Sequence, residues 1–189
     1  VADTLKQRFA LGQCIGQGNI QAVEFVRQVE HMQETQPKPF FYAQMNLLSS
    51  HDRPRALAIL ADVGNMEPER KSRCPLELEP EQYDLGKRRL MAAWNLICAM
   101  PGMPCIYYGD ERGMQGGSDP FCRAPMVWGD TSRSDVGKDL TGHYKALGAM
   151  RKGSLALRTG SFTCMAVNSD VICVARVSDD DQTVVAVCN

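Results

Sequence analysis

The sequence predicts an α/β protein in which parallel strand–helix units are followed by an antiparallel β segment. Helical and strand-like patterns alternate through residues 1–158, and only strand-like patterns follow in residues 159–189. Alternation is typical of parallel sheets covered by helices, whereas consecutive strands joined by short turns are typical of antiparallel sheets. Polar residues also cluster directly after the two predicted parallel strands, where such sheets carry their functional loops.

Four segments carry the signals of helices. The helix expected at residues 80–100 begins with a proline beside glutamates, and its apolar residues, Trp94 among them, share one face. Apolar side chains at helical spacing in residues 3–34 are interrupted by a glycine-rich stretch at residues 12–19, and Pro37 ends the pattern. Shorter helices are expected at residues 54–63 and 141–152.

The predicted strands form two groups. Residues 40–48 and 103–108 are apolar runs, which is typical of buried parallel strands. The antiparallel group is expected at residues 161–167, 171–177 and 183–188. Two parallel strands can neither close a barrel nor cover their own edges, and the last strand stops at Asn189 in mid-pattern. We therefore expect the chain to be one part of a larger enzyme.

Composition and charge narrow the classes of partner. The 189 residues are 44% hydrophobic and 23% charged, and the formal net charge is −1. This balance provides no basic surface for nucleic acid or for an anionic membrane. No apolar run approaches the roughly 18 residues that a membrane-spanning helix needs. We expect neither of these partners, and a neutral substrate such as a sugar fits the charge.

The eight cysteines form no CxxC pair, and no histidine lies at zinc-finger spacing from them. Most lie in apolar stretches such as ICAM and VICVA, where cysteine packs as a small hydrophobic residue. We expect reduced thiols and a cytoplasmic location, because a chain of this size can form a core without disulfides. The sequence predicts no metal site and no cofactor; calcium binding and the oligomeric state of the whole protein stay open.

His51 and Asp52 directly follow the first predicted parallel strand. A carboxylate at this position could stabilise positive charge, act as a base or bind a metal ion, and the adjacent imidazole could bind a hydroxyl group. The alternative is structural, because Asp52 precedes Pro54 in the way that an N-cap residue precedes a helix with proline in its first turn. The two roles are compatible.

Four charged residues follow the second predicted strand. Asp110 and Glu111 are expected at the strand end, where neighbouring side chains point to opposite faces, so adjacency does not make them a catalytic pair. Asp119 and Arg123 could form an ion pair that shapes the loop, or could bind sugar hydroxyls. Three aromatic residues could stack on sugar rings or belong to the core, and two adjacent tyrosines in one strand cannot both point inward: Tyr107, Tyr108 and Trp128.

Two segments together resemble the α-amylase family of retaining glycoside hydrolases. NLLSSHDRPR, which contains His51 and Asp52, resembles NLLGSHDTPR at the seventh barrel strand of the neopullulanase, cyclomaltodextrinase and maltogenic amylase group. PGMPCIYYGDERGMQGGSDPFCRAPMVWGD resembles the eighth strand and following loop of the same group, GTPCIYYGDEIGLTGGNDPDCRRPFPWD. The resemblance implies that residues 1–158 are the last third of a TIM-type (β/α)8 barrel, and residues 159–189 the opening of a C-terminal β domain.

The resemblance also implies roles for individual residues. Asp52 matches the acid that stabilises the transition state, and His51 matches the histidine that binds the same sugar. Asp119 and Arg123 match loop residues that contact the next sugar toward the nonreducing end. The implied substrates are maltodextrins, cyclodextrins or pullulan, cleaved at α-1,4 bonds, with α-1,6 bonds as a further option.

The chain departs from the family pattern in three respects. Ser49 replaces the usual glycine, and Arg53 replaces the usual threonine beside Asp52. The motifs that carry the family's nucleophile and general acid, GxRxD and ExW, are absent, and retaining hydrolysis needs both groups about 5–5.5 Å apart. We expect the isolated chain to be inactive. A transglycosylase of the same family, and a non-catalytic relative that binds sugar or protein, are the alternatives.

Overall fold

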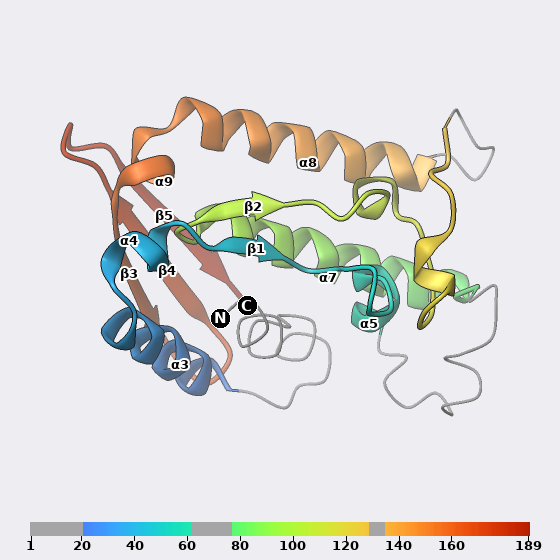
Figure 1. The fold of residues 1–189 in the computed structure, drawn as a ribbon, viewed down its shortest axis with the longest axis horizontal. Coiled ribbons are helices and arrows are strands. Elements are labelled where there is room, and N and C mark those ends of the chain that lie inside the picture. The colour runs from blue at the N-terminus through green and yellow to red at the C-terminus, as the bar shows by residue number, and fades with distance from the viewer. Residues whose placement is uncertain (1–20, 62–76, 129–134) are drawn as a thin grey trace.

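The computed structural model describes residues 21–61, 77–128 and 135–189. Parts of the sequence expectations, including the helix before residue 21 and the glycine-rich stretch at residues 12–19, lie outside the described residues. Figure 1 shows two parallel strands at the centre, helices along them and a second sheet at one end. The elements are α3 (Ala22–Thr35), α4 (Lys38–Tyr42), β1 (Met45–Leu47), α5 (Ala56–Leu60), α7 (Pro80–Ala99), β2 (Met103–Cys105), α8 (Asp135–Gly153), α9 (Leu155–Thr159), β3 (Ser161–Ala166), β4 (Ile172–Val177) and β5 (Thr183–Cys188), with 3₁₀ helices η2 (Asp110–Arg112) and η3 (Phe121–Arg123).

Strands β1 and β2 pair in parallel, as the alternation of elements predicts, with Met45 opposite Met103 and Leu47 opposite Cys105. Both strands are shorter than expected. The prediction of a strand from residue 40 was wrong, because that segment belongs to α4, whose first turn contains a proline that favours helix initiation. Gly102 precedes β2 with φ +99°, and a Cβ there would lie 2.4 Å from the Gln44 carbonyl oxygen, so glycine is required.

Helices α5 and α7 connect the two strands and form much of the core. The expected long helix is present as α7, and a capping box between Glu79 and Gln82 begins it. Helix α5 lies close against α7 at Gly86, where an added Cβ would be 2.6 Å from the Leu57 carbonyl oxygen. Leu57 itself is fully buried. The small residue is thus needed for the close approach of the two helices.

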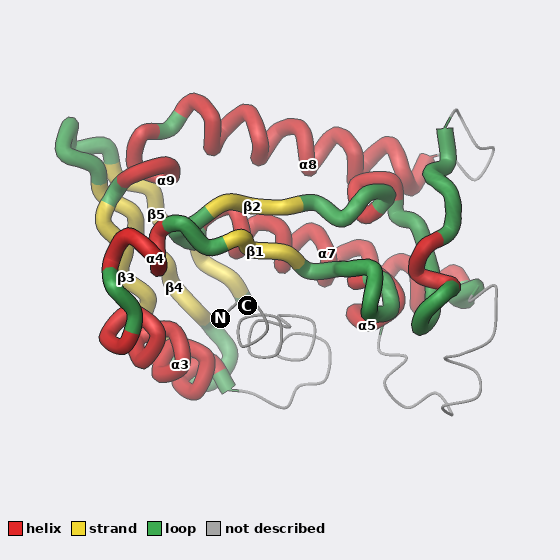
Figure 2. Tube along the Cα trace, in the orientation of Figure 1, coloured by secondary structure: helices red, strands yellow, loops and turns green. Residues whose placement is uncertain are grey.

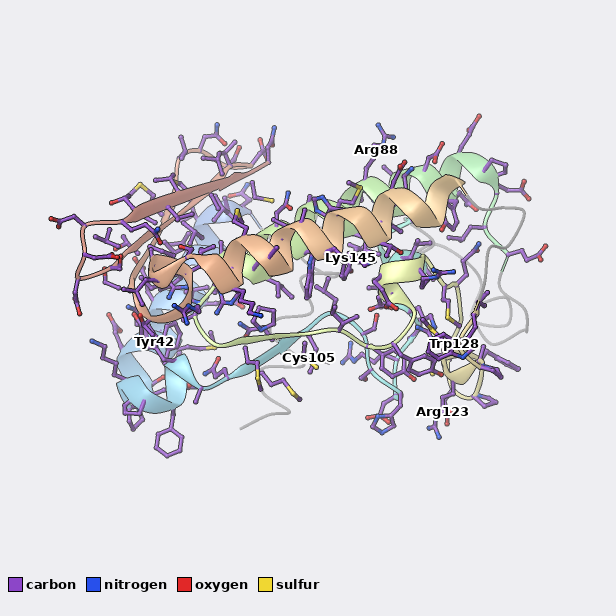
Figure 3. The ribbon with its side chains drawn as sticks, turned by 90° about the horizontal axis from the view of Figure 1, so that it is seen from above. Tyr42, Arg88, Cys105, Arg123, Trp128 and Lys145 are labelled. Atoms are coloured by element: carbon purple, nitrogen blue, oxygen red, sulfur yellow. The ribbon has the colours of Figure 1, made fainter. Side chains whose placement is uncertain are left out.

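Helix α8 packs along α7, on the same side of the parallel pair (Figure 3). Trp94 of α7 stacks on Tyr144 of α8 with 4.4 Å between ring centroids and 10° between planes. Trp94 is 4% exposed, which confirms its expected place in the core. Among the described helices, none combines the length and apolar character that crossing a bilayer requires.

The three C-terminal strands form an antiparallel sheet in the order β3-β4-β5, as expected (Figure 2). One arginine attaches this sheet to the helices, and a second one ties α8 to the end of α7. The buried Arg176 of β4 donates to the carbonyl oxygens of Ala99, Gly160 and Ser161 at 2.9, 3.0 and 3.1 Å. Arg151 of α8 donates to three further carbonyl oxygens at the end of α7 and directly after it, those of Cys98, Met100 and Gly102.

Candidate active site

The loops that follow the two parallel strands emerge at the same end of the molecule, at the right in Figure 1. This follows from the parallel pairing, because the carboxyl ends of parallel neighbours lie side by side. The first loop, residues 48–55, and the second loop, residues 106–128, are joined by a backbone hydrogen bond of 3.0 Å from the Arg55 N–H to the Gly116 carbonyl oxygen. The polar residues that the sequence places after two separate strands are therefore brought together.

His51 and Asp52 lie on a turn in the first loop. The His51 Nε2 and the Asp52 Oδ1 are 2.7 Å apart, and the two side chains are 62% and 55% exposed. Asp52 does not cap a helix, contrary to the structural alternative. Helix α5 begins only at Ala56, whose N–H donates to the Ser49 Oγ at 2.8 Å. Ser49, which replaces the glycine of the family pattern, thus accepts the hydrogen bond from the first residue of α5. The Asp52 carboxylate instead faces solvent, with His51 as its neighbour.

The tip of this turn is held by the second loop. The His51 carbonyl oxygen accepts from the Cys122 Sγ and from the Arg123 Nε, both at 3.1 Å. The Arg123 Nε also lies 2.8 Å from the Asp119 Oδ1. The ion pair at a spacing of four residues is thus present, and both side chains remain about half exposed, at 48% and 50%. Figure 3 shows Arg123 at the end of the molecule that carries Trp128.

Asp110 lies beneath the turn and is 3% exposed. It begins the 3₁₀ helix η2 and does not end a strand, because β2 stops at Cys105. Burial raises the pKa of the Asp110 carboxyl to about 7, and this effect outweighs the hydrogen bond from Ser49 and the charge of Arg55, which lower it. The adjacent Glu111 carboxylate instead accepts from the Gly109 N–H at 2.9 Å. Asp110 therefore contacts the first loop through Arg55, whereas Glu111 binds the backbone of its own loop.

Arg55 is the residue that the sequence analysis missed. Its side chain is completely buried, and its Nη1 donates to the Tyr108 carbonyl oxygen and lies 3.5 Å from the Asp110 Oδ1. The guanidinium carbon is 4.9 Å from the ring centroid of Tyr107 and 4.7 Å from that of Tyr108. The available signal was the arginine shared by the two aligned motifs, HDRPR and HDTPR.

The aromatic residues differ from the expectation. Tyr107 and Tyr108 lie beyond the end of β2, so the alternation of a strand does not separate them, and both rings contact Arg55. Trp128 is 84% exposed, which removes it from the core of the described residues. Within the described part of the chain, no group of three or more His, Cys, Asp or Glu residues could hold a metal ion. The exposed groups are two carboxylates, an imidazole and a guanidinium, which can bind hydroxyl groups and stabilise a developing positive charge.

Known proteins are similar to this chain in both sequence and fold. No family model matches the chain. A cyclomaltodextrinase of Geobacillus thermopakistaniensis is 34% identical over 172 residues, which cover 90% of this chain and 25% of that protein. A solved cyclomaltodextrinase structure matches with a TM-score of 0.73 and 29% identity, over 95% of this chain and 27% of that one.

A cyclic α-maltosyl-(1→6)-maltose hydrolase of Arthrobacter globiformis, solved in complex with that cyclic sugar, shares the fold with a TM-score of 0.72 at 23% identity, over 95% of this chain and 35% of that one. The chain spans about a quarter of the length of the cyclomaltodextrinases that it matches. Both loops match the motifs of one enzyme group, and the fold is shared with a solved structure of that group. These two findings together show to which family the chain belongs. The chain belongs to the α-amylase family of glycoside hydrolases, beside the cyclomaltodextrinases and maltogenic amylases.

Proposed function

We propose that the chain supplies one section of the active site of a retaining glycoside hydrolase that cleaves α-1,4 glucosidic bonds in maltodextrins, cyclodextrins or pullulan, with α-1,6 bonds as a further option. In this proposal residues 1–158 are the C-terminal part of the catalytic (β/α)8 barrel and include its seventh and eighth strands. Residues 159–189 begin the C-terminal β domain. The cyclomaltodextrinase similarity supports this class of substrate.

The observation that carries the proposal is the paired, solvent-facing His51 and Asp52 on a turn that the second loop holds in place. Cleavage of a glycosidic bond passes through a transition state with positive charge on the sugar ring. The Asp52 carboxylate is free to stabilise that charge, since Ser49 and not Asp52 binds the first N–H of α5. His51 is placed to bind a hydroxyl group of the same sugar.

Asp119 and Arg123 are proposed to contact the next sugar toward the nonreducing end. Their carboxylate and guanidinium groups are 2.8 Å apart and half exposed, beside the His51 turn. A charged pair of this kind offers both donors and acceptors to sugar hydroxyls. The formal net charge of the chain is −1, so it creates no strong electrostatic field that would attract a charged ligand. This charge is compatible with an uncharged sugar as substrate.

The nucleophile and the general acid are proposed to come from earlier strands of the whole protein. Retaining enzymes place these two carboxyl groups about 5–5.5 Å apart across the bond that is cleaved. The isolated chain should therefore hydrolyse no α-glucan. Incubation of the purified 189-residue chain with maltoheptaose and β-cyclodextrin tests this, and turnover that persists after removal of host amylase would contradict it.

The decisive test is the substitution Asp52→Asn in the full-length protein. A group that binds the transition state more tightly than the substrate should lower kcat on the order of 10³-fold when removed, with a smaller effect on KM. A near-normal kcat would remove Asp52 from the mechanism. Product analysis at high sugar concentration separates hydrolysis, which gives only shorter sugars, from transglycosylation.

A further inference from the structure

Arg55 connects the two site loops from the inside. Its side chain is fully buried. Its backbone N–H donates to the Gly116 carbonyl oxygen at 3.0 Å, and its Nη1 donates to the Tyr108 carbonyl oxygen. Both acceptors belong to the loop after β2, whereas Arg55 ends the loop after β1. One residue, through its backbone and its side chain, therefore fixes the spacing of the two loops.

The surroundings of the guanidinium are shaped for it. The rings of Tyr107 and Tyr108 lie 4.9 and 4.7 Å from the guanidinium carbon, within the range of cation–π attraction. Gly109 has φ +87°, and a Cβ there would lie 3.1 Å from the Arg55 Nη1 and 2.2 Å from the Met114 sulfur. The second loop thus adopts a backbone conformation that only glycine takes readily in order to pass beside the arginine.

This arrangement is a poor source of stability. The Arg55 Nε and Nη2 make no hydrogen bond with any residue that the structure describes, and the Asp110 Oδ1 is 3.5 Å from Nη1. A buried donor without a partner costs free energy, and a buried charge pair with long contacts repays little of its desolvation. A residue held at such a cost is better explained by the geometry that it imposes on its neighbours.

The turn that carries His51 and Asp52 lies between Ser49 and Arg55, and both of these residues contact Asp110. The Ser49 hydroxyl accepts from the Ala56 N–H at 2.8 Å and hydrogen-bonds to the Asp110 carboxyl. Arg55 reaches the same carboxyl from the other end of the turn. The base of the turn is therefore fixed on both sides by one buried group of the second loop.

We propose that Arg55 is a positioning residue: it fixes the base of the first loop to the second loop and thereby sets the place of the Asp52 carboxylate and the His51 ring. Its effect on catalysis rests on the proposed function, whereas its effect on the turn does not. Arg55 itself is buried and touches no substrate. Lysine cannot replace it, because a single ammonium group lacks the planar fork that contacts a carbonyl, a carboxyl and two rings together.

The test compares Arg55→Lys with Arg176→Lys in the full-length protein. Arg176 is a matched control, since it is also fully buried and binds carbonyl oxygens, but at the far end of the molecule. We expect Arg55→Lys to lower kcat about 10²-fold with a much smaller change in KM, as small displacements of a catalytic group do. Arg176→Lys should lower the melting temperature and leave kcat unchanged. A folded Arg55→Lys protein with wild-type kcat overturns the proposal.

A second measurement does not depend on activity. The chain contains three histidines, so the Cε1–H signal of His51 can be assigned in a ¹H–¹³C spectrum of the 189-residue chain by single substitution. The His51 signal should move in Arg55→Lys and stay in place in Arg176→Lys, with the other two histidines unmoved in both. If Arg55→Lys does not fold, Arg55→Gln takes its place, with the same shift expected. An unmoved His51 signal overturns the proposal, whereas an inactive full-length protein would overturn only the proposed function.

Discussion

Asp110 leads to a specific expectation about stability and pH. Its carboxyl is almost completely buried, and burial raises its pKa from 3.8 to about 7. In the unfolded chain the group returns to its ordinary value, so between these two pH values the folded protein binds a proton that the unfolded chain does not. This contribution to stability is fully present below about pH 4 and is lost as the pH rises through 7.

The magnitude follows from the difference between the two pKa values. Each pH unit of difference corresponds to about 1.4 kcal/mol, so the full contribution is at most about 4 kcal/mol. For a chain of this length that equals a shift in melting temperature of roughly 8–16 °C. Other acids act in the opposite direction; the pKa of Asp180, for example, is lowered by hydrogen bonds from Ser178 and the Gln182 N–H. The pH dependence of the wild-type stability therefore does not isolate the contribution of Asp110. A comparison with a variant that lacks this carboxyl is needed.

The assay is urea unfolding of the wild-type chain and of Asp110→Asn at a series of pH values from 4 to 8. Asparagine has the shape of the uncharged acid, so the wild type should lose stability relative to the variant as the pH rises. Glu111→Gln is the matched control, because it removes a neighbouring charge that binds the Gly109 N–H outside the Arg55 contact. If the difference between wild type and Asp110→Asn does not change with pH, Asp110 stays ionised beside Arg55, and the argument from burial is wrong.

Three further substitutions follow from particular contacts. Arg123→Ala in the full-length protein should reduce kcat/KM more for maltohexaose than for a p-nitrophenyl glucoside, since the proposed outer sugar site is filled only by the longer substrate; equal fractional losses on both would rule out sugar contact. Arg176→Met should lower the free energy of unfolding by about 3 kcal/mol, because three carbonyl oxygens, two of them in buried hydrogen bonds, lose their donor, and a loss below about 1 kcal/mol in urea unfolding would contradict this. Gly86→Ala should cost about 1–3 kcal/mol, because the added Cβ would lie 2.6 Å from the Leu57 carbonyl oxygen; an unchanged urea midpoint would show that α5 moves aside freely.

The periodicity of the sequence predicted most of the regular structure. The long helix α7 and the three antiparallel strands lie where their patterns indicated, since their apolar residues recur with a clear period over many positions. The two parallel strands are shorter than the sequence predicted. A short apolar run carries no period that separates strand from helix, and Pro39 near the start of α4 decided that case.

The candidate site was predictable in its exposed part and not in its buried part. Motif resemblance selected His51, Asp52, Asp119 and Arg123, and the structure brings their two loops together. The motif also contains Arg55, but the match gave that residue no role, because its partners Tyr108 and Asp110 lie more than fifty positions along the chain. The capping alternative for Asp52 failed for a similar reason: the acceptor is Ser49, seven residues before the N–H that it binds.

The arginines at the two ends of the parallel strands differ in how completely their guanidinium groups are hydrogen-bonded. At the end where the strands begin, each guanidinium nitrogen of Arg176 donates to a carbonyl oxygen, and Arg151 binds three more. At the end where the strands finish, Arg55 leaves two buried donors without a partner among the described residues. Full pairing is what stability favours, and incomplete pairing persists where geometry is retained for another reason. In β/α barrels the strand ends that carry chemistry are the carboxyl ends, which is the end where this chain tolerates the incompletely hydrogen-bonded arginine.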